Sequence, residues 1–128
     1  MNKRCLLIVD DEDDITIPIL RKAILDYSDR YEPITAVDGY DALETMKKRD
    51  VAVVILDIRM RNLDGWGVIA KAQEDAVMRR IPIVVSSGHL DDEDKNRLQL
   101  LGIKHILDKP YPMETLFKAV LEADQTGA

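Results

Sequence analysis

The stretch Val51-Ala52-Val53-Val54-Ile55-Leu56-Asp57 decides the fold of this chain, because six apolar residues are followed at once by an acid. An unbroken apolar run of this length, rich in β-branched residues, is typical of a strand that is buried on both faces. Four more short apolar runs occupy residues 5–9, 34–37, 81–85 and 103–107. Because these runs alternate with helical stretches, they predict an α/β fold with a doubly wound parallel sheet.

Helices are expected between the predicted strands and after the last one. In the last helix, one buried stripe is predicted from the spacing of Met113, Leu116, Phe117, Val120 and Leu121. In the first helix, the same reasoning places four residues on one face: Ile17, Leu20, Ile24 and Tyr27. Gly102 is expected to end the fourth helix, and Pro112 suits the first turn of the last one.

Two glycines and one proline mark further helix boundaries. Gly39 and Gly65 mark the loops that open the second and third helices. Pro18 lies a few residues into the first helix, where proline removes a backbone hydrogen bond and tends to kink the axis. The helix therefore either begins late or bends, and we favour a proline tolerated in its first turn.

Length and composition favour one domain that binds neither nucleic acid nor membranes. A chain of 128 residues suits a single domain spanning residues 1–128, with no output domain attached. Its 24 acidic and 18 basic residues give a formal net charge of -6, and no Lys/Arg run is long enough to follow a phosphate backbone. The single Cys5 excludes an internal disulfide and suits a reducing cytoplasm, as does the lack of a signal peptide or membrane span.

Polar side chains follow four of the predicted strands. Asp10 and Asp11 follow the first run and Asp57 the third, while Ser86-Ser87 and Asp108-Lys109-Pro110 follow the fourth and fifth. In parallel sheets such residues meet at one edge. Two carboxylates ~4 Å apart repel by about 4 kcal/mol at an effective dielectric near 20, so the cluster is expected to bind a cation. Oxygen-only ligands favour Mg²⁺.

The residue types at this edge suit phosphoryl transfer to a carboxylate. Asp57 is the candidate nucleophile, because an ionised carboxylate needs no general base. We expect Asp11 and Asp57 to bind Mg²⁺ directly and Asp10 to bind it through water. Lys109 is the expected fixed cation. Ser87 is the expected hydroxyl donor to a phosphoryl oxygen, with Ser86 as its rival.

The ordered motifs resemble the receiver domain of bacterial two-component response regulators, from about residue 3 to residue 121. The resemblance rests on Leu7-Ile8-Val9-Asp10-Asp11-Glu12, Val54-Ile55-Leu56-Asp57, Met60 with Gly65, Pro82-Ile83-Val84-Val85-Ser86-Ser87-Gly88, and Asp108-Lys109-Pro110-Tyr111. No single motif is specific, whereas the ordered set with these separations is.

The resemblance implies a flavodoxin-like, CheY-like sheet of five strands in the order 2-1-3-4-5, flanked by five helices. It implies a phosphoacceptor signalling domain rather than a turnover enzyme, in which Asp57 takes a phosphoryl group from a phosphohistidine on a sensor histidine kinase or histidine phosphotransfer protein. The backbone carbonyl of Arg59 would join the Mg²⁺ ligands, and the Lys109–Pro110 bond would be cis. A downstream target protein would read the face built from the fourth helix, fifth strand and fifth helix.

Several positions depart from the family pattern. Arg61 stands where proline is usual, Gly88 replaces the commoner alanine, and Ile106 replaces an aromatic residue whose rotation commonly accompanies activation. Any output must then come from backbone or helix motion. We hypothesise that Arg59 and His89 shield an aspartyl phosphate from water and lengthen its life.

Three other interpretations remain at this point. Asp57 alone resembles a strand-end acid that caps a loop, and Asp10 or Asp11 resembles a helix N-cap. A phosphohydrolase would carry an Asp-x-Asp-x-Thr signature, but Ile15 stands where the threonine belongs. An unphosphorylated interaction module with the same fold usually lacks one of the acids or the lysine, and this chain has them all.

Overall fold

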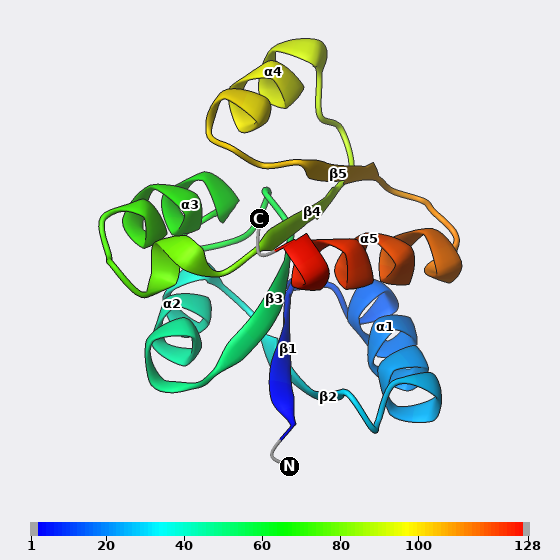
Figure 1. Cartoon of the computed structure of the whole chain (residues 1–128). Helices are drawn as coiled ribbons and strands as arrows, with labels where there is room; N and C mark the ends of the chain where they lie inside the picture. Colours follow the sequence, from blue (N-terminus) through cyan, green and yellow to red (C-terminus); the bar gives the residue numbers. More distant parts are fainter. Residues whose placement is uncertain (1–2, 127–128) are drawn as a thin grey trace.

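The computed structural model describes residues 3–126, in which strands and helices alternate along the chain (Figure 1). In chain order the elements are β1 (Arg4–Val9), α1 (Asp13–Asp26), β2 (Tyr31–Ala36), α2 (Gly39–Lys48), β3 (Val51–Leu56), α3 (Gly65–Gln73), the 3₁₀ turn η1 (Met78–Arg80), β4 (Ile83–Ser87), α4 (Asp92–Leu100), β5 (His105–Asp108) and α5 (Met113–Thr126). No helix among these residues is long and apolar enough to cross a membrane.

The strands form one parallel sheet in the order β2-β1-β3-β4-β5, which confirms the predicted fold class. The chain turns from β1 to one edge of the sheet and then returns through β3 to the other edge. The change of direction lies between the carboxyl ends of β1 and β3, where doubly wound sheets commonly bind ligands. Every residue of β3 is buried, as its unbroken apolar sequence predicted.

Two helical layers cover the two faces of the sheet (Figure 1). One core cluster includes Met46 of α2, Ile69 of α3 and Leu98 of α4 against one face. The other includes Ile19 of α1 and Phe117 of α5 against the opposite face. Both faces of the central strands are therefore shielded from solvent by helices. Polar groups can reach solvent at the carboxyl ends of these strands.

Three strands begin two or more residues away from their predicted starts. β2 begins at Tyr31, three residues earlier than predicted, and includes Pro33. Proline is tolerated there because β2 is an edge strand. β4 begins after Pro82 and extends through Ser87. β5 begins at His105, because the Ile103 N–H takes part in the cap that follows α4.

Ile103 ends α4 together with Gly102, which has a φ of 88°. The N–H groups of Gly102 and Ile103 donate to the carbonyls of Gln99 and Leu98, so the helix closes in a Schellman motif. The prediction that Gly102 ends the fourth helix is confirmed. Gly39 and Gly65 are the first residues of α2 and α3, also as predicted.

The predicted buried face of α1 is partly confirmed, because Leu20 and Tyr27 pack against the core and the other two predicted residues do not. The buried residues are Thr16, Ile19 and Ala23, whereas Ile17 and Ile24 are 48% and 57% exposed. One residue step turns a helix by ~100°, so the packed face lies beside the predicted one. Small side chains at positions 16 and 23 allow the helix to approach the sheet closely.

Two prolines do not occupy the predicted helix positions. Pro18 is the sixth residue of α1 rather than part of its first turn, so the first-turn interpretation is wrong. The helix begins at Asp13, which also excludes a late start. Pro112 lies just before α5 and accepts hydrogen bonds from the N–H groups of Thr115 and Leu116 through its carbonyl.

Candidate functional site

Four strands bring the predicted site residues to one edge of the sheet. Asp10 directly follows β1, Asp57 follows β3, Ser87 ends β4 and Lys109 follows β5. These strands are neighbours in the order β1-β3-β4-β5, so their carboxyl ends meet. The fold thereby pairs the side chains of Lys109 and Asp10, which are 99 positions apart in the sequence.

The Lys109 ammonium lies between two carboxylates. Its Nζ donates to Oδ2 of Asp10 at 2.8 Å and lies 3.5 Å from Oδ2 of Asp57. Burial by itself disfavours the charged ammonium, but the hydrogen bond to Asp10 and the charges of Asp57 and Asp10 outweigh it and raise the pKa of Lys109. The lysine therefore remains a cation at neutral pH.

The Asp57 carboxylate is buried, with 3% of the residue exposed. Its Oδ1 accepts hydrogen bonds from the Ser87 hydroxyl at 2.9 Å and from the Arg59 N–H at 3.4 Å. Burial raises the pKa of Asp57, the Lys109 charge opposes that change, and the Asp10 charge adds to it. The side chain is thus held in one orientation, in a setting that makes its negative charge costly.

The two adjacent serines have different partners. The Ser87 hydroxyl contacts Asp57, whereas the Ser86 hydroxyl makes a hydrogen bond with the Tyr111 hydroxyl. Successive residues of a strand point to opposite faces, which explains the division. Of the two candidates, Ser87 is the one that lies at the acidic site.

The Asp10 carboxylate has a partner on each oxygen. Its Oδ2 accepts from Lys109, and its Oδ1 accepts from the Glu12 N–H at 2.9 Å. Asp10 therefore satisfies a backbone donor just before α1. The N-cap residue of α1 is Glu12, so the alternative that Asp10 or Asp11 is that N-cap is wrong. Asp11 is less buried and lies 3.8 Å from the exposed Arg61 guanidinium, a contact of little energetic weight.

A cavity of about 530 Å³ opens above Asp57. Ser87 and Lys109 line its polar side, while Ile15, Pro18 and Met113 line an apolar side formed by α1 and the start of α5. This volume lies within the ~300–1,000 Å³ range of small-molecule sites. A small molecule can therefore approach the carboxylate from this side.

Arg59 and His89 both line the same cavity. The Arg59 guanidinium donates to the His89 carbonyl at 3.3 Å, which joins the loop after β3 to the loop after β4. His89 has a φ of 61°, an uncommon conformation for a residue other than glycine. The Arg59 side chain thus contacts the His89 backbone at the cavity that Asp57 also lines.

With this geometry established, comparison with known proteins identifies the family. The sequence model of the response regulator receiver domain matches residues 6–121 of this chain. The chain belongs to the response regulator receiver domain family. Receiver domains are phosphoacceptor signalling modules of two-component systems rather than turnover enzymes, as the sequence predicted.

Proteins from several bacteria are similar to this chain. Protein PilG of Pseudomonas aeruginosa is 30% identical over 87 residues, which cover 68% of this chain and 64% of PilG. A structure of chemotaxis protein CheY4 from Vibrio cholerae matches with a TM-score of 0.82 and 26% identity, over 94% of this chain and 98% of that one. A receiver domain of a putative LuxO repressor from Vibrio parahaemolyticus matches with a TM-score of 0.88, over 98% of this chain and 93% of that one. At 17% identity it shows the fold alone.

The chain spans less than two thirds of the curated relatives it first matches, from 64% of PilG down to 27% of the transcriptional regulatory protein GlrR of Escherichia coli. What those whole proteins do is therefore a separate matter from what this receiver domain does.

The acidic cluster of this receiver domain suits a hard divalent cation. Carboxylate oxygens of Asp10, Asp11, Glu12 and Asp57 all lie within 4.8 Å of one another. The donor set consists of oxygen alone and carries more negative charge than Lys109 neutralises, which is the chemistry that Mg²⁺ favours. Glu12 was not among the predicted ligands, although it directly follows the two predicted acids. For Arg59, the structure records only its N–H near Asp57, so a role for its carbonyl stays a prediction.

Two further features of the site differ in how far they were predicted. The contact between Tyr111 and Ser86 was not predicted, because nothing in the sequence indicates which strand face the tyrosine reaches. The Lys109–Pro110 peptide bond is cis, as the resemblance implied.

Proposed function

We propose that Asp57 accepts a phosphoryl group from a phosphohistidine on a sensor histidine kinase or a histidine phosphotransfer protein. In this step a carboxylate oxygen forms a bond to phosphorus and the phosphorus–nitrogen bond breaks, so the imidazole nitrogen keeps the electron pair. The observation that carries the proposal is the position of Asp57. Its carboxylate lies at a 530 Å³ cavity and is fixed by Ser87, the Arg59 N–H and Lys109.

The neighbours of Asp57 have distinct roles in this proposal. Lys109 stabilises the negative charge on the phosphoryl oxygens from its position 3.5 Å from the carboxylate. Asp11 and Asp57 would bind Mg²⁺ directly, Asp10 would bind it through water, and the carbonyl of Arg59 would complete the protein ligands. When bound, Mg²⁺ neutralises charge between the nucleophile and the phosphoryl group. Both oxygens of Asp10 already have protein partners, which supports its indirect role.

Phosphorylation would act on the fold through Ser87. Its hydroxyl donates to Asp57 in the described structure and would instead donate to a phosphoryl oxygen, which displaces the end of β4. The Ser87 carbonyl accepts from the Lys109 N–H at 3.0 Å, and Lys95 of α4 pairs with Asp108 of β5 at 2.9 Å. These contacts support a coupled change in the α4, β5 and α5 face, which a downstream target protein would bind.

We further propose that residues 1–128 act as one receiver domain in the cytoplasm, through protein contacts. The family match over residues 6–121 and the buried, reduced Cys5 support this proposal. Family membership supports a histidine kinase as the phosphoryl source.

Intact-mass spectrometry after incubation with acetyl phosphate tests the proposal. With Mg²⁺ the parent chain should gain one phosphoryl group, and with EDTA it should gain none. Asp57→Asn should gain none under either condition. Asp64→Asn is the matched control, because this acid caps α3 through the Gly67 N–H and lies outside the acidic cluster. Labelling of Asp57→Asn equal to that of the parent would refute Asp57 as the acceptor.

A further inference from the structure

Basic residues gather at the edge of the sheet opposite to the acidic site. A Lys or Arg stands at the start of each strand or shortly before it: Lys3 and Arg4 at β1, Arg30 at β2, Lys47, Lys48 and Arg49 at β3, Arg79 and Arg80 at β4, and Lys104 at β5. In a parallel sheet all strands begin at the same edge. The fold therefore collects basic residues that are scattered along the sequence.

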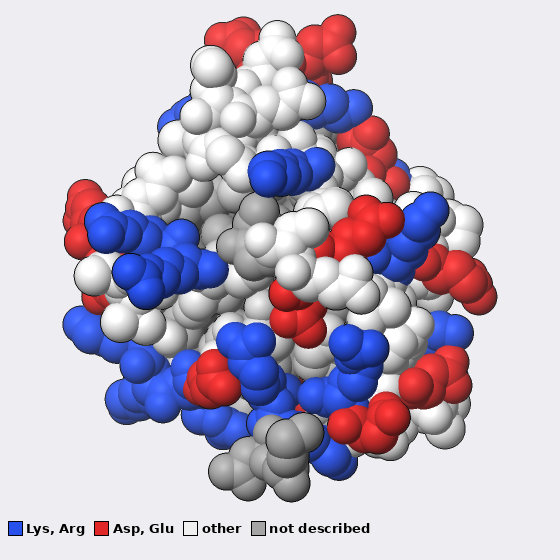
Figure 2. Space-filling view, viewed as in Figure 1, with Lys and Arg blue, Asp and Glu red and all other residues white. Residues whose placement is uncertain are grey.

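Figure 2 shows the result on the surface. Lys and Arg side chains gather over the part of the viewed face where the described chain begins and where α2 and the start of β3 lie. The chain as a whole carries a formal charge of -6, so this accumulation runs against the overall composition. Anions are attracted to this edge and repelled from the acidic one.

A cavity of about 300 Å³ lies at this basic edge. Its lining includes Arg4, Arg49, Asp50 and Arg80 around an apolar floor that contains Met46 and Ile81. Three arginines against one acid give the lining an excess of positive charge. Arginine is also the side chain best suited to bidentate contact with phosphate oxygens.

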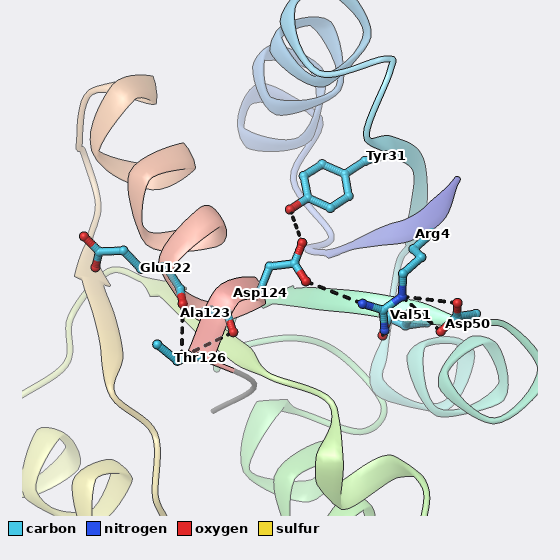
Figure 3. Close-up of polar contacts among 8 residues, drawn as sticks. All are labelled: Arg4, Tyr31, Asp50, Val51, Glu122, Ala123, Asp124 and Thr126. Carbon is cyan, nitrogen blue, oxygen red and sulfur yellow. Dashed lines mark hydrogen bonds and ion pairs between the residues drawn. The ribbon is translucent and has the colours of Figure 1, made fainter. Parts of the chain in front are cut away.

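Arg4 is held in place by acids on both sides, as Figure 3 shows. Its guanidinium contacts Asp50 at 3.2 Å and Asp124 at 3.5 Å, and it donates to the Val51 carbonyl at 3.3 Å. The Tyr31 hydroxyl donates to Asp124 at 2.6 Å, which fixes that carboxylate in turn. The Arg4 guanidinium therefore already has protein acceptors, and it is not the main hydrogen-bond donor to an anion in the cavity.

Arg80 is the guanidinium most available to a ligand. It lines the cavity, is exposed, and makes no ion pair with any of residues 3–126. Arg49 uses one of its nitrogens on Glu32 at 3.0 Å, and its remaining N–H groups have no ion-pair partner in the same range. Two guanidinium groups with free donors thus line a pocket whose lining also includes the apolar residues Met46 and Ile81.

We propose that this cavity binds a small phosphate-bearing molecule with an apolar body, of the size of a nucleoside diphosphate. Arg49 and Arg80 bind the phosphate oxygens, and the floor at Met46 and Ile81 packs against the body of the ligand. Asp50, Asp124 and Glu32 interrupt the positive surface, which disfavours a long phosphate backbone and favours a compact anion. The cavity volume of about 300 Å³ is at the lower limit of the ~300–1,000 Å³ range that is typical of small-molecule sites.

This site is separate from the proposed phosphoacceptor. The six residues of β3 separate the two edges of the sheet by about 20 Å, at ~3.3 Å per residue. Ligand binding at the basic edge therefore needs neither Asp57 nor Mg²⁺, and either proposal can fail without the other.

Isothermal titration calorimetry in EDTA tests the proposal, with ADP and inorganic pyrophosphate as probes. ADP should bind with a Kd below about 1 mM and more tightly than pyrophosphate, because only ADP has a body to pack on the floor. Arg80→Gln should weaken ADP binding about tenfold, since it removes a charged donor. Asp57→Asn and Lys118→Gln, an exposed residue of α5, should leave the Kd within about twofold.

Four results would overturn the proposal. They are no detectable heat with either probe, ADP binding equal to that of pyrophosphate, an unchanged Kd in Arg80→Gln, and an equal loss of binding in Lys118→Gln. The last result would show that only overall charge matters. A separate titration with a DNA duplex tests nucleic acid as the alternative ligand. Tighter binding of the duplex than of ADP would show that the basic residues at this edge bind nucleic acid instead.

Discussion

Replacement of Lys109 by Met tests how strongly one ammonium stabilises the acidic site. The Lys109 Nζ lies 2.8 Å from Asp10 and 3.5 Å from Asp57. At an effective dielectric near 20, these distances correspond to gross attractions of about 6 and about 5 kcal/mol. Desolvation of the three charges offsets much of this gain, at several kcal/mol per ion. Removal of one partner from a buried pair nevertheless costs about 3–5 kcal/mol, because the remaining charges lose their compensation.

We therefore expect Lys109→Met to lower the free energy of unfolding by about 3 kcal/mol without Mg²⁺. Addition of Mg²⁺ should restore part of this loss, because a cation bound by the acids supplies the missing positive charge. Urea denaturation with and without Mg²⁺ measures both effects. Lys118→Met on the exposed side of α5 is the control and should change stability by less than about 0.5 kcal/mol. A loss below about 1 kcal/mol in Lys109→Met without Mg²⁺ would refute the electrostatic account of the site.

Three further predictions concern other parts of the fold. The double substitution Arg59→Ala/His89→Ala should shorten the half-life of the phosphorylated chain, measured by loss of the phosphoryl mass over time, and an unchanged half-life would refute the shielding hypothesis. Burial raises the pKa of the Cys5 thiol to about 11, so iodoacetamide should alkylate it at about pH 8 only after urea unfolding, and rapid reaction in the native protein would contradict its burial. Gly65→Ala should destabilise the fold by about 1–3 kcal/mol because the new Cβ would lie 2.6 Å from backbone atoms. Gly88→Ala meets nothing within 4 Å and should be tolerated, so equal urea midpoints for the two variants would refute this reason.

The position of the candidate site was predictable because it depends on strand order alone. An apolar run followed by an acid, a serine or a lysine fixes where each polar group lies once the strands are parallel. The positions of Asp10, Asp57, Ser87 and Lys109 at one end of the sheet do not depend on side-chain conformations, so the sequence predicted that they lie together. Ser87 was the expected hydroxyl donor with Ser86 as its rival, and the structure places the Ser87 hydroxyl on Asp57.

The buried face of α1 was only partly predictable from apolar spacing, which placed Leu20 and Tyr27 correctly. Ile17 and Ile24 form a regular apolar stripe, yet the helix packs through Thr16, Ile19 and Ala23. Hydrophobic periodicity reports which residues prefer burial, whereas close packing on a sheet also selects small side chains. The start of β2 was missed for a related reason, because an edge strand tolerates polar residues and proline that a central strand excludes.

The basic edge was also beyond sequence reasoning. Its lysines and arginines occur in short groups, none longer than residues 47–49, and whole helices and strands separate these groups. The parallel topology brings them together, as it does the acids at the opposite edge.

The most direct test of the central claim is to locate the phosphoryl group within the phosphorylated chain. Acetyl phosphate with Mg²⁺ should label the protein, and borohydride should then reduce the aspartyl phosphate to homoserine. Peptide sequencing by mass spectrometry should find homoserine at position 57 and aspartate at positions 10, 11 and 64. Homoserine at any of those other positions, with aspartate retained at 57, would contradict the account.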